Sequence, residues 1–257
     1  MLLDWTRPEL WRRWIETESE RRCGVADTAA RLRERFAAVR SFHAARPTDI
    51  ASYSRHGIRP LTKSGWSELV DEVLLSLIDD RAIIAAVIRA RDVQFALVSE
   101  GRVHFCCDRR LLEERDGYSL LFGSLSLLAV AIQIDKEFGT DLKGALRRRG
   151  EPIVFVCDVP TAIIEDDTLA ALTTCLRKPK ATAPLFEFHF AIAGALPPAA
   201  IVGHYRPERV IDAVYGRHIG CGEAAVAGDD SIGRRNNAIQ TSAQWLPGPD
   251  SNQRPTG

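Results

Sequence analysis

The chain has 257 residues, 46% hydrophobic and 26% charged, a composition that can build a sizeable globular core. Lysine plus arginine equals aspartate plus glutamate at 34 each, so the net charge is zero and no strong nucleic-acid signal exists. The longest apolar run, residues 120–134, falls short of the roughly 20 residues that a membrane span needs, and the charged start is not a signal peptide. We therefore expect a cytoplasmic protein without a membrane partner.

The cysteines lack the C-x-x-C spacing of a zinc or redox site, and no pair of histidines completes one. Cys106 and Cys107 are adjacent, so in a strand they point to opposite faces, and buried packing is the expected role. Motifs for a phosphate-binding loop, a nucleophile elbow, a zinc protease and a dinucleotide-binding unit are missing from the sequence. No metal site is expected.

Residues 1–40 are expected to form an N-terminal helical segment. Residues 7–38 are predicted to be helical, with a second helix over 27–39 because apolar residues recur there at helical spacing. This segment, which carries Trp11 and Trp14, either packs against the main body or forms a partner-binding arm.

The stretch "SFHAARPTDIASYSRHGIRPL" (41–61) has the pattern of the entrance to a site. A short strand delivers His43 and Arg46, a proline ends it, a helical segment follows, and a His-Gly-Ile-Arg-Pro turn closes the stretch. Each residue also has a structural alternative. His43 can bond the backbone at a strand end, and Arg46 can pair with a neighbouring acid.

Four further residues are candidates for ligand contacts in the same way. Tyr53 can stack on a ring or fill a groove between helices, and Tyr118 is similar. His56-Gly57 can contact a ligand or only form a turn, where glycine supplies the positive φ.

The middle of the chain predicts helices and then strands. An amphipathic helix is expected over 63–78 and another over 79–91. The period then changes, and 95–99 and 102–108 are predicted to be two strands joined by a tight hairpin. Residues 120–138 are apolar on most sides, which is typical of a buried helix.

Later segments indicate further strands. Residues 151–160 form the clearest strand, bounded by prolines, and 184–194 alternates like a half-exposed strand. Residues 196–211 predict a turn, a short strand and another turn. The fold class is therefore α+β, with N-terminal helices followed by a mixed, mostly antiparallel sheet split around a cleft, and the core domain spans 41–215.

The C-terminal stretch 216–257 lacks periodicity and is rich in Gly, Asn, Asp and Pro, so a disordered tail is expected. Its end, "GPDSNQRPTG", is similar to tails produced when a reading frame runs antisense through a transfer-RNA gene. Such a locus is a common integration point for mobile elements, and a tail of this origin carries no function.

The order of these features resembles the ADP-ribosyltransferase-like fold, the NAD-dependent scaffold of bacterial toxins and poly-ADP-ribose polymerases. "SFHAARPTDIASYSRHGI" resembles its first block, while "EPIVFVCDVP" and "LPPAAIVGHY" resemble its later strands. The resemblance implies NAD as cofactor, with contacts from His43, Arg46, Tyr53, His56 and Gly57. It further implies that a macromolecule, such as a protein acceptor, is the second partner. His43 and Tyr118 are then the candidate catalytic residues.

The chain departs from this family where a catalytic glutamate is expected. The block "Y-G-S-E" of such relatives corresponds to Phe122-Gly123-Ser124 followed by Leu125. A leucine cannot balance the positive charge that develops when the glycosidic bond of NAD breaks. Either another carboxylate substitutes, with Glu113, Glu114 and Asp116 nearest in sequence, or the protein is inactive.

The expectation is thus an ADP-ribosyltransferase-like protein that binds NAD or a related nucleotide and whose transferase activity is in doubt. The alternative is a non-catalytic α+β module that binds a nucleotide or a protein partner.

Overall fold

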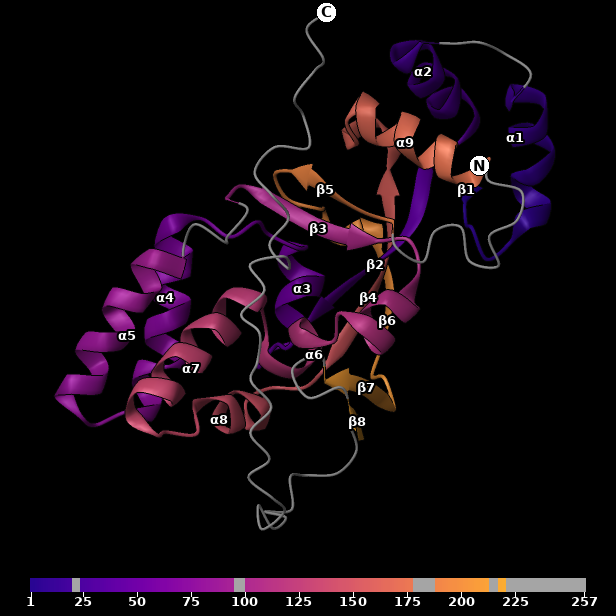
Figure 1. Ribbon diagram of the computed structural model, residues 1–257. Helices are drawn as coiled ribbons and strands as arrows, with labels where there is room; N and C mark the ends of the chain where they lie inside the picture. Colours follow the sequence, from indigo (N-terminus) through magenta and orange to yellow (C-terminus); the bar gives the residue numbers. More distant parts are fainter. Residues whose placement is uncertain (20–23, 95–99, 178–187, 213–216, 221–257) are drawn as a thin grey trace, which may run out of the picture. The chain divides into compact units, whose positions relative to one another are not determined.

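The computed structural model describes residues 1–19, 24–94, 100–177, 188–212 and 217–220 (Figure 1). The fold is α+β, with helices around a mostly antiparallel sheet. The strand expected at 95–99 and nearly all of the tail expected to be disordered lie outside these residues.

The described strands form a six-stranded sheet and a separate two-stranded sheet. Successive side chains of a strand point to opposite faces of the sheet, so apolar residues along the larger sheet pack against the helical layers on either side. The strands are β1 (Leu2–Leu3), β2 (Ala38–Ala45), β3 (Arg102–Cys106), β4 (Ile153–Pro160), β5 (His189–Ala193), β6 (Ile201–Tyr205), β7 (Arg209–Asp212) and β8 (Arg217–Gly220).

In the larger sheet the strand order is β5-β3-β2-β4-β6, and β1 runs parallel to the start of β2. β2 pairs antiparallel with β4 along its whole length, and β3 pairs antiparallel with β5 along its whole length. Between β2 and β3, however, the register holds one pair, Phe42 with Cys106. The sheet therefore consists of two well-paired parts that meet at a narrow junction.

The helices connect these strands and cover both faces of the sheet. Short 3₁₀ turns occur at Pro8–Leu10, Leu75–Leu77, Thr161–Ile163 and Pro198–Ala200, and a π-helical turn occurs at Leu111–Arg115. The α-helices are α1 (Arg12–Ser19), α2 (Val25–Arg35), α3 (Ala51–His56), α4 (Lys63–Val73), α5 (Arg81–Gln94), α6 (Tyr118–Phe122), α7 (Leu125–Phe138), α8 (Leu142–Arg148) and α9 (Asp166–Leu176).

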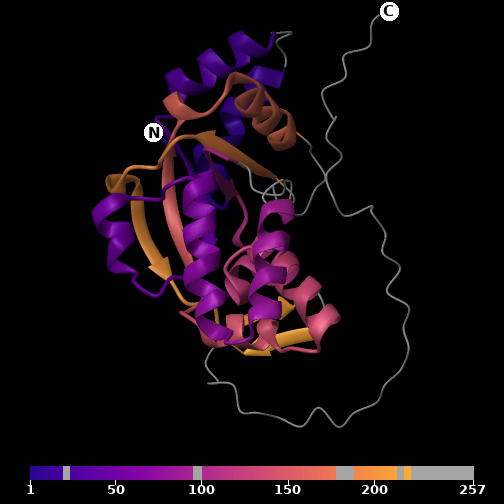
Figure 2. The same ribbon diagram turned by 90° about the vertical axis from the view of Figure 1, so that its left-hand side faces the viewer.

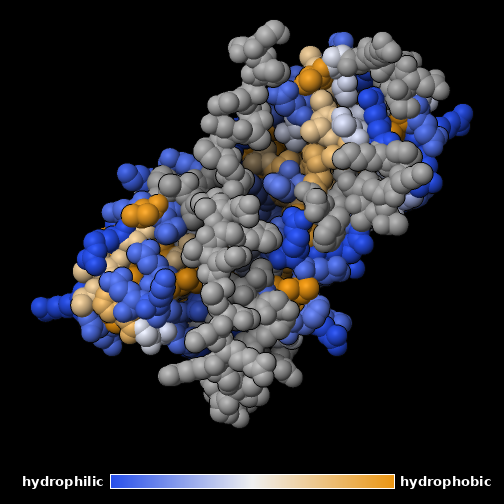
Figure 3. All heavy atoms as spheres, in the orientation of Figure 1, coloured by the Kyte–Doolittle hydropathy of each residue, from blue (hydrophilic) through white to orange (hydrophobic). Residues whose placement is uncertain are grey.

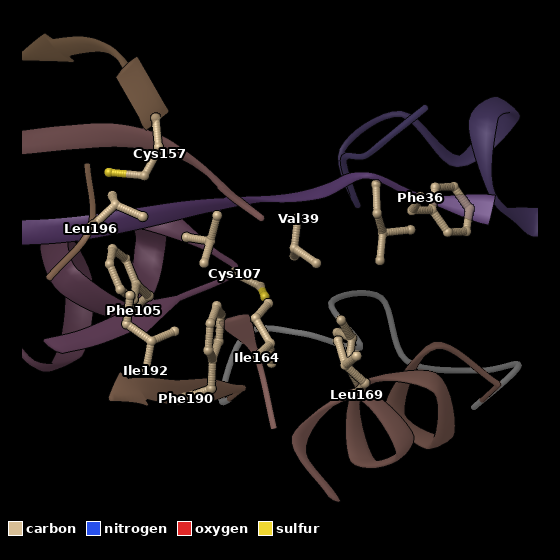
Figure 4. Packing of buried hydrophobic residues seen from close by; sticks show 14 of the residues in the cluster. Phe36, Val39, Phe105, Cys107, Cys157, Ile164, Leu169, Phe190, Ile192 and Leu196 are labelled. Atoms are coloured by element: carbon tan, nitrogen blue, oxygen red, sulfur yellow. The ribbon is translucent and has the colours of Figure 1, made fainter. Parts of the chain in front are cut away.

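One face of the sheet packs against α1, α2 and α9 (Figure 1). Figure 4 shows part of this layer, in which Val39 of β2 and Cys107, directly after β3, lie near Ile164 and Leu169. The N-terminal segment belongs to it, because Trp11 is 6% exposed and Trp14 packs edge-on against Phe36, with ring centroids 5.3 Å apart. Trp11 is thus a core residue and Trp14 packs against the core, so nothing in their placement supports a partner-binding arm.

The opposite face packs against α4, α5, α6, α7 and α8, which Figures 1 and 2 show gathered on the other side of the sheet. Trp66 of α4 is fully buried there, and its Nε1 donates to the carbonyl of Arg91, 3.0 Å away. Figure 3 shows apolar residues reaching the surface of this helical layer in separate groups among hydrophilic ones, and Ile88 and Ile132 are among those exposed.

Two expected helices have different bounds. The helix expected over 27–39 ends at Arg35, because Phe36 is already extended and Ala38 enters the sheet between β1 and β4. Pairing in the sheet thus overrides a helical pattern. The helix expected over 120–138 is two helices, since Gly123 adopts a φ of 86° and Ser124 caps α7 by accepting from Leu127 N.

Candidate functional site

A pocket of about 300 Å³ lies where β2 ends and α3 crosses the sheet. One of its residues comes from the sheet, and the others come from α3 and the turn that follows it. The sequence motif at 41–61 therefore folds into one concave site. The lining residues are His43, Ser52, Tyr53, His56, Gly57, Ile58 and Arg59.

His43 forms the sheet side of the pocket and is half-buried. Its Nδ1 lies 2.8 Å from the backbone carbonyl of His104, and its ring centroid is 5.7 Å from that of Phe105. Because a carbonyl can only accept, Nδ1 must carry the proton and donate. Burial lowers the pKa of His43, which favours the neutral ring and leaves Nε2 as a hydrogen-bond acceptor.

Tyr53 forms the wall contributed by α3. Its ring stacks on Phe155 of β4, with centroids 4.3 Å apart and planes 20° from parallel. Burial raises the pKa of Tyr53, so its hydroxyl stays protonated at neutral pH. Stacking on a core ring fixes the orientation of this side chain at the pocket.

His56 and Gly57 end α3 and turn the chain. Gly57 has a φ of 73° and a ψ of −166°, a conformation that is nearly restricted to glycine. A Cβ built at Gly57 would lie 1.9 Å from the carbonyl oxygen of Leu196, so the two backbones approach too closely for any side chain. The turn expected at this position is confirmed. Both its positive φ and the close approach of the Leu196 carbonyl require a glycine there.

Ser52, Ile58 and Arg59 complete the pocket and were not singled out from the sequence. Ser52 Oγ donates to the carbonyl of Asp49, 2.7 Å away. Arg59 is exposed and makes no ion pair with any residue that the structure describes. The sequence did carry a signal for Arg59, because this arginine directly follows the "HGI" turn and lies within the motif predicted over residues 41–61.

Arg46, predicted to contact the cofactor, lies outside the pocket lining. Its guanidinium donates to the carbonyls of Leu120 and Arg149, both 2.7 Å away, and to that of Arg147. These carbonyls lie in α6 and at the end of α8. The last carbonyls of a helix have no N–H donor within the helix, so they need a donor from elsewhere. Arg46 therefore ties the exit of β2 to the ends of two helices, a structural role.

Tyr118, predicted to be catalytic, is also absent from the pocket lining. It begins α6 and packs against the core cluster on the other face of the sheet from that containing Tyr53. The two candidate tyrosines thus lie in different layers, because the chain crosses from one face to the other between α3 and α4.

The carboxylates considered as substitutes for the missing glutamate do not line the pocket either. Glu113 accepts from the hydroxyl of Tyr205, 2.6 Å away, and Asp116 pairs with Arg115 at 3.3 Å. Leu125, at the expected glutamate position, is the first residue of α7 and is 42% exposed. All the described lining residues are neutral or basic.

The cysteines named above behave as packing residues. Cys106 and Cys107 are buried, and burial raises the pKa of the Cys107 thiol to about 12. Within the described parts of the chain, no group of three or more histidines, cysteines and acids could hold a metal ion. The helices described there are all too short or too polar to cross a bilayer.

Comparison with known proteins gives no relative. No family model matches the chain, and searches of the curated proteins and of the solved structures return no significant match. The pocket's own residues therefore carry the functional interpretation.

Proposed function

We propose that the His43 pocket binds NAD or a related nucleotide, and that the protein is an ADP-ribosyltransferase-like fold that holds this ligand without cleaving it. The observation that carries the proposal is the meeting of His43, Tyr53 and His56 around one pocket, with Arg59 beside them. The first three of these side chains are also among those that the sequence resemblance implies as contacts of the cofactor.

The lining suits the chemistry of a nucleotide. The neutral imidazole of His43 offers Nε2 as an acceptor for a sugar hydroxyl. The guanidinium of Arg59 matches a phosphate group, to which it can donate two parallel hydrogen bonds. Tyr53 adds an amphipathic ring whose hydroxyl makes no hydrogen bond to another described residue.

Cleavage of the glycosidic bond needs a different feature. The reaction builds an oxocarbenium-like centre, and a nearby carboxylate stabilises it. The described residues that line the pocket include no aspartate or glutamate. Losing one preorganised electrostatic contact costs about 3–4 kcal/mol in the transition state, several hundredfold in rate. Binding without turnover follows.

Calorimetric titration with NAD, together with chromatographic assay of released nicotinamide, tests both parts. Wild type should give saturable heat, and the heat should disappear in His43→Ala while circular dichroism shows an intact fold. Released nicotinamide should stay at the level of a protein-free control. Absence of heat with wild type would refute the proposal that the protein binds NAD. Steady release of nicotinamide would refute the proposal that it does not cleave NAD.

Leu125→Glu provides a matched test of the missing carboxylate. Because residue 125 is at the start of α7 and outside the pocket lining, a glutamate there should leave nicotinamide release unchanged. Gain of release in this variant would mean that the start of α7 reaches the bound ligand.

A further inference from the structure

The pocket is built beside the junction of the two parts of the sheet, here called the seam between β2 and β3. β3 is fully paired with β5 on its outer side, and β2 is fully paired with β4. At the seam the register holds the pair Phe42 and Cys106, after which the strands separate toward the pocket. A junction with so few ladder bonds opens more easily than the strands on either side of it.

Side chains supply the remaining polar ties across the seam. The strongest by geometry is the bond from His43 Nδ1 to the carbonyl of His104, at 2.8 Å. The thiol of Cys106 lies 3.7 Å from the carbonyl of Phe42, a long contact to a weak donor.

Of the described residues that line the pocket, His43 alone belongs to the sheet. The loop that leaves the pocket is tied to the β3 side, since the amide of Gly101 donates to the carbonyl of Leu61, 3.2 Å away. This bond ties the chain that follows the pocket to the segment that leads into β3.

The two nitrogens of the His43 imidazole connect the pocket to the seam. A neutral ring carries one proton, so Nδ1 can donate across the seam only while Nε2 is an acceptor. A ligand that donates a hydrogen bond to Nε2 stabilises this tautomer and makes Nδ1 a better donor. A ligand on one nitrogen thus strengthens the tie formed by the other.

We propose that His43 couples ligand binding to closure of the seam between β2 and β3, so that an occupied pocket holds the two parts of the sheet together. This inference rests on the proposed function for its ligand, whereas the tie itself exists in the free protein. By linkage, opening of the seam weakens ligand binding to the same degree that the ligand suppresses opening.

Two isosteric variants separate the roles of the two nitrogens. The amide of His43→Asn can occupy the place of Nδ1 and keep the bond to the carbonyl of His104, but it has nothing at Nε2. The amide of His43→Gln reaches the place of Nε2 and leaves the carbonyl without its donor. His104→Gln is the control, because it keeps the accepting carbonyl and changes an exposed side chain.

Hydrogen exchange at the amides of β2 and β3 that border the seam tests the tie without any ligand. His43→Gln should speed this exchange about fivefold, the worth of one hydrogen bond, relative to amides between β2 and β4. His43→Asn and His104→Gln should stay near wild type. Equal exchange in His43→Gln and wild type would overturn the tie, whatever the protein binds.

Exchange in the presence of saturating NAD tests the coupling. In wild type NAD should slow seam exchange by several-fold more than exchange elsewhere in the sheet. In His43→Gln this extra protection should be lost. Binding of NAD with no effect on exchange at the seam would refute the coupling and leave the binding proposal standing. Absence of NAD binding would refute the proposed function and the coupling together, and the ligand-free tie would then stand or fall on the exchange experiment without NAD.

Discussion

Ile58 and Leu196 exchange two backbone hydrogen bonds, of 3.0 and 2.9 Å, that join the turn after α3 to the segment between β5 and β6. This isolated bridge holds the pocket-lining turn against the sheet. It also joins the "HGI" and "LPP" stretches that carried the family resemblance, although they are far apart in sequence. The pocket therefore depends on a close contact between two backbones, and a substitution that adds even one atom there should destabilise the protein.

Gly57→Ala should destabilise the protein strongly, because its Cβ would meet the Leu196 carbonyl and its backbone conformation suits glycine alone. We expect a loss of more than about 2 kcal/mol in the free energy of unfolding by urea titration. Gly101→Ala is the matched control, since Gly101 has the same φ of 73° with nothing within 4 Å of its Cβ. Its loss should be clearly smaller, and equal losses would contradict the role of the close approach.

Arg46→Ala should lower stability and leave the affinity for NAD unchanged where the protein is folded. Three helix-end carbonyls lose their donor, and hydrogen bonds to a charged group are each worth more than neutral ones, so a loss of about 2–3 kcal/mol is expected. Arg46→Lys, which keeps the charge without the planar fork, should recover part of it. A loss of NAD binding at full stability would show that Arg46 contacts the ligand after all.

The difference between Arg46 and His43 shows how far sequence patterns reach. Alternation along β2 indicates that residues 43 and 46 fall on different faces, yet the pattern cannot say which face will carry a pocket. That depends on α3, which packs through Tyr53 on Phe155, a contact between distant segments. Local motifs therefore predicted the cluster around residues 53–57, and only the packing assigned Arg46 to the opposite helical layer.

The fold was predictable to a similar degree. The strand 151–160 and the helix at 63–78 have strong patterns, and both exist as β4 and α4 with an added 3₁₀ turn. The predicted end of α2 was wrong, since the pairing of Ala38 and Val39 with β1 and β4 is a non-local effect. The described partners of β3 are β2 and β5, which come from distant parts of the chain, whereas the hairpin expected with 95–99 lies outside the described residues.

Arg59→Ala should weaken NAD binding roughly fivefold at low salt, since the side chain is exposed and its contact with phosphate is partly screened. The difference from wild type should shrink as salt rises. Arg55→Ala is the control, because Arg55 lies on α3 but pairs with Asp49 at 2.7 Å instead of lining the pocket. Calorimetric titration at two salt concentrations measures both, and equal effects of the two variants would contradict the assignment of Arg59 to the phosphate.

The stability of the protein should fall as the pH drops from neutral. Burial lowers the pKa of His43 below its ordinary value of 6.5, so the unfolded state takes up a proton before the folded state does. The stabilising contribution of neutral His43 is therefore complete above pH 6.5 and is lost as the pH falls through the folded-state pKa. His104 acts in the same direction, because partial desolvation of its ring at the surface and then the neighbouring His189 lower its pKa as well.

Urea titrations at pH 7.5 and 5.5 measure this dependence. The change in unfolding free energy between the two pH values should be smaller in His43→Asn than in wild type, and smaller again when His104→Gln is added. A pH dependence that is unchanged by both substitutions would contradict the buried, neutral state of His43.

The imidazole nitrogens of His43, observed by nuclear magnetic resonance in the ¹⁵N-labelled protein, give the most direct test of NAD binding at this residue. The His43 signals, identified by their absence in His43→Asn, should show a proton on Nδ1 and a free Nε2 in the protein alone. Addition of NAD should shift Nε2 as it accepts a hydrogen bond while Nδ1 stays protonated. Unchanged His43 nitrogens at NAD concentrations that saturate the protein would place the ligand elsewhere and contradict the account.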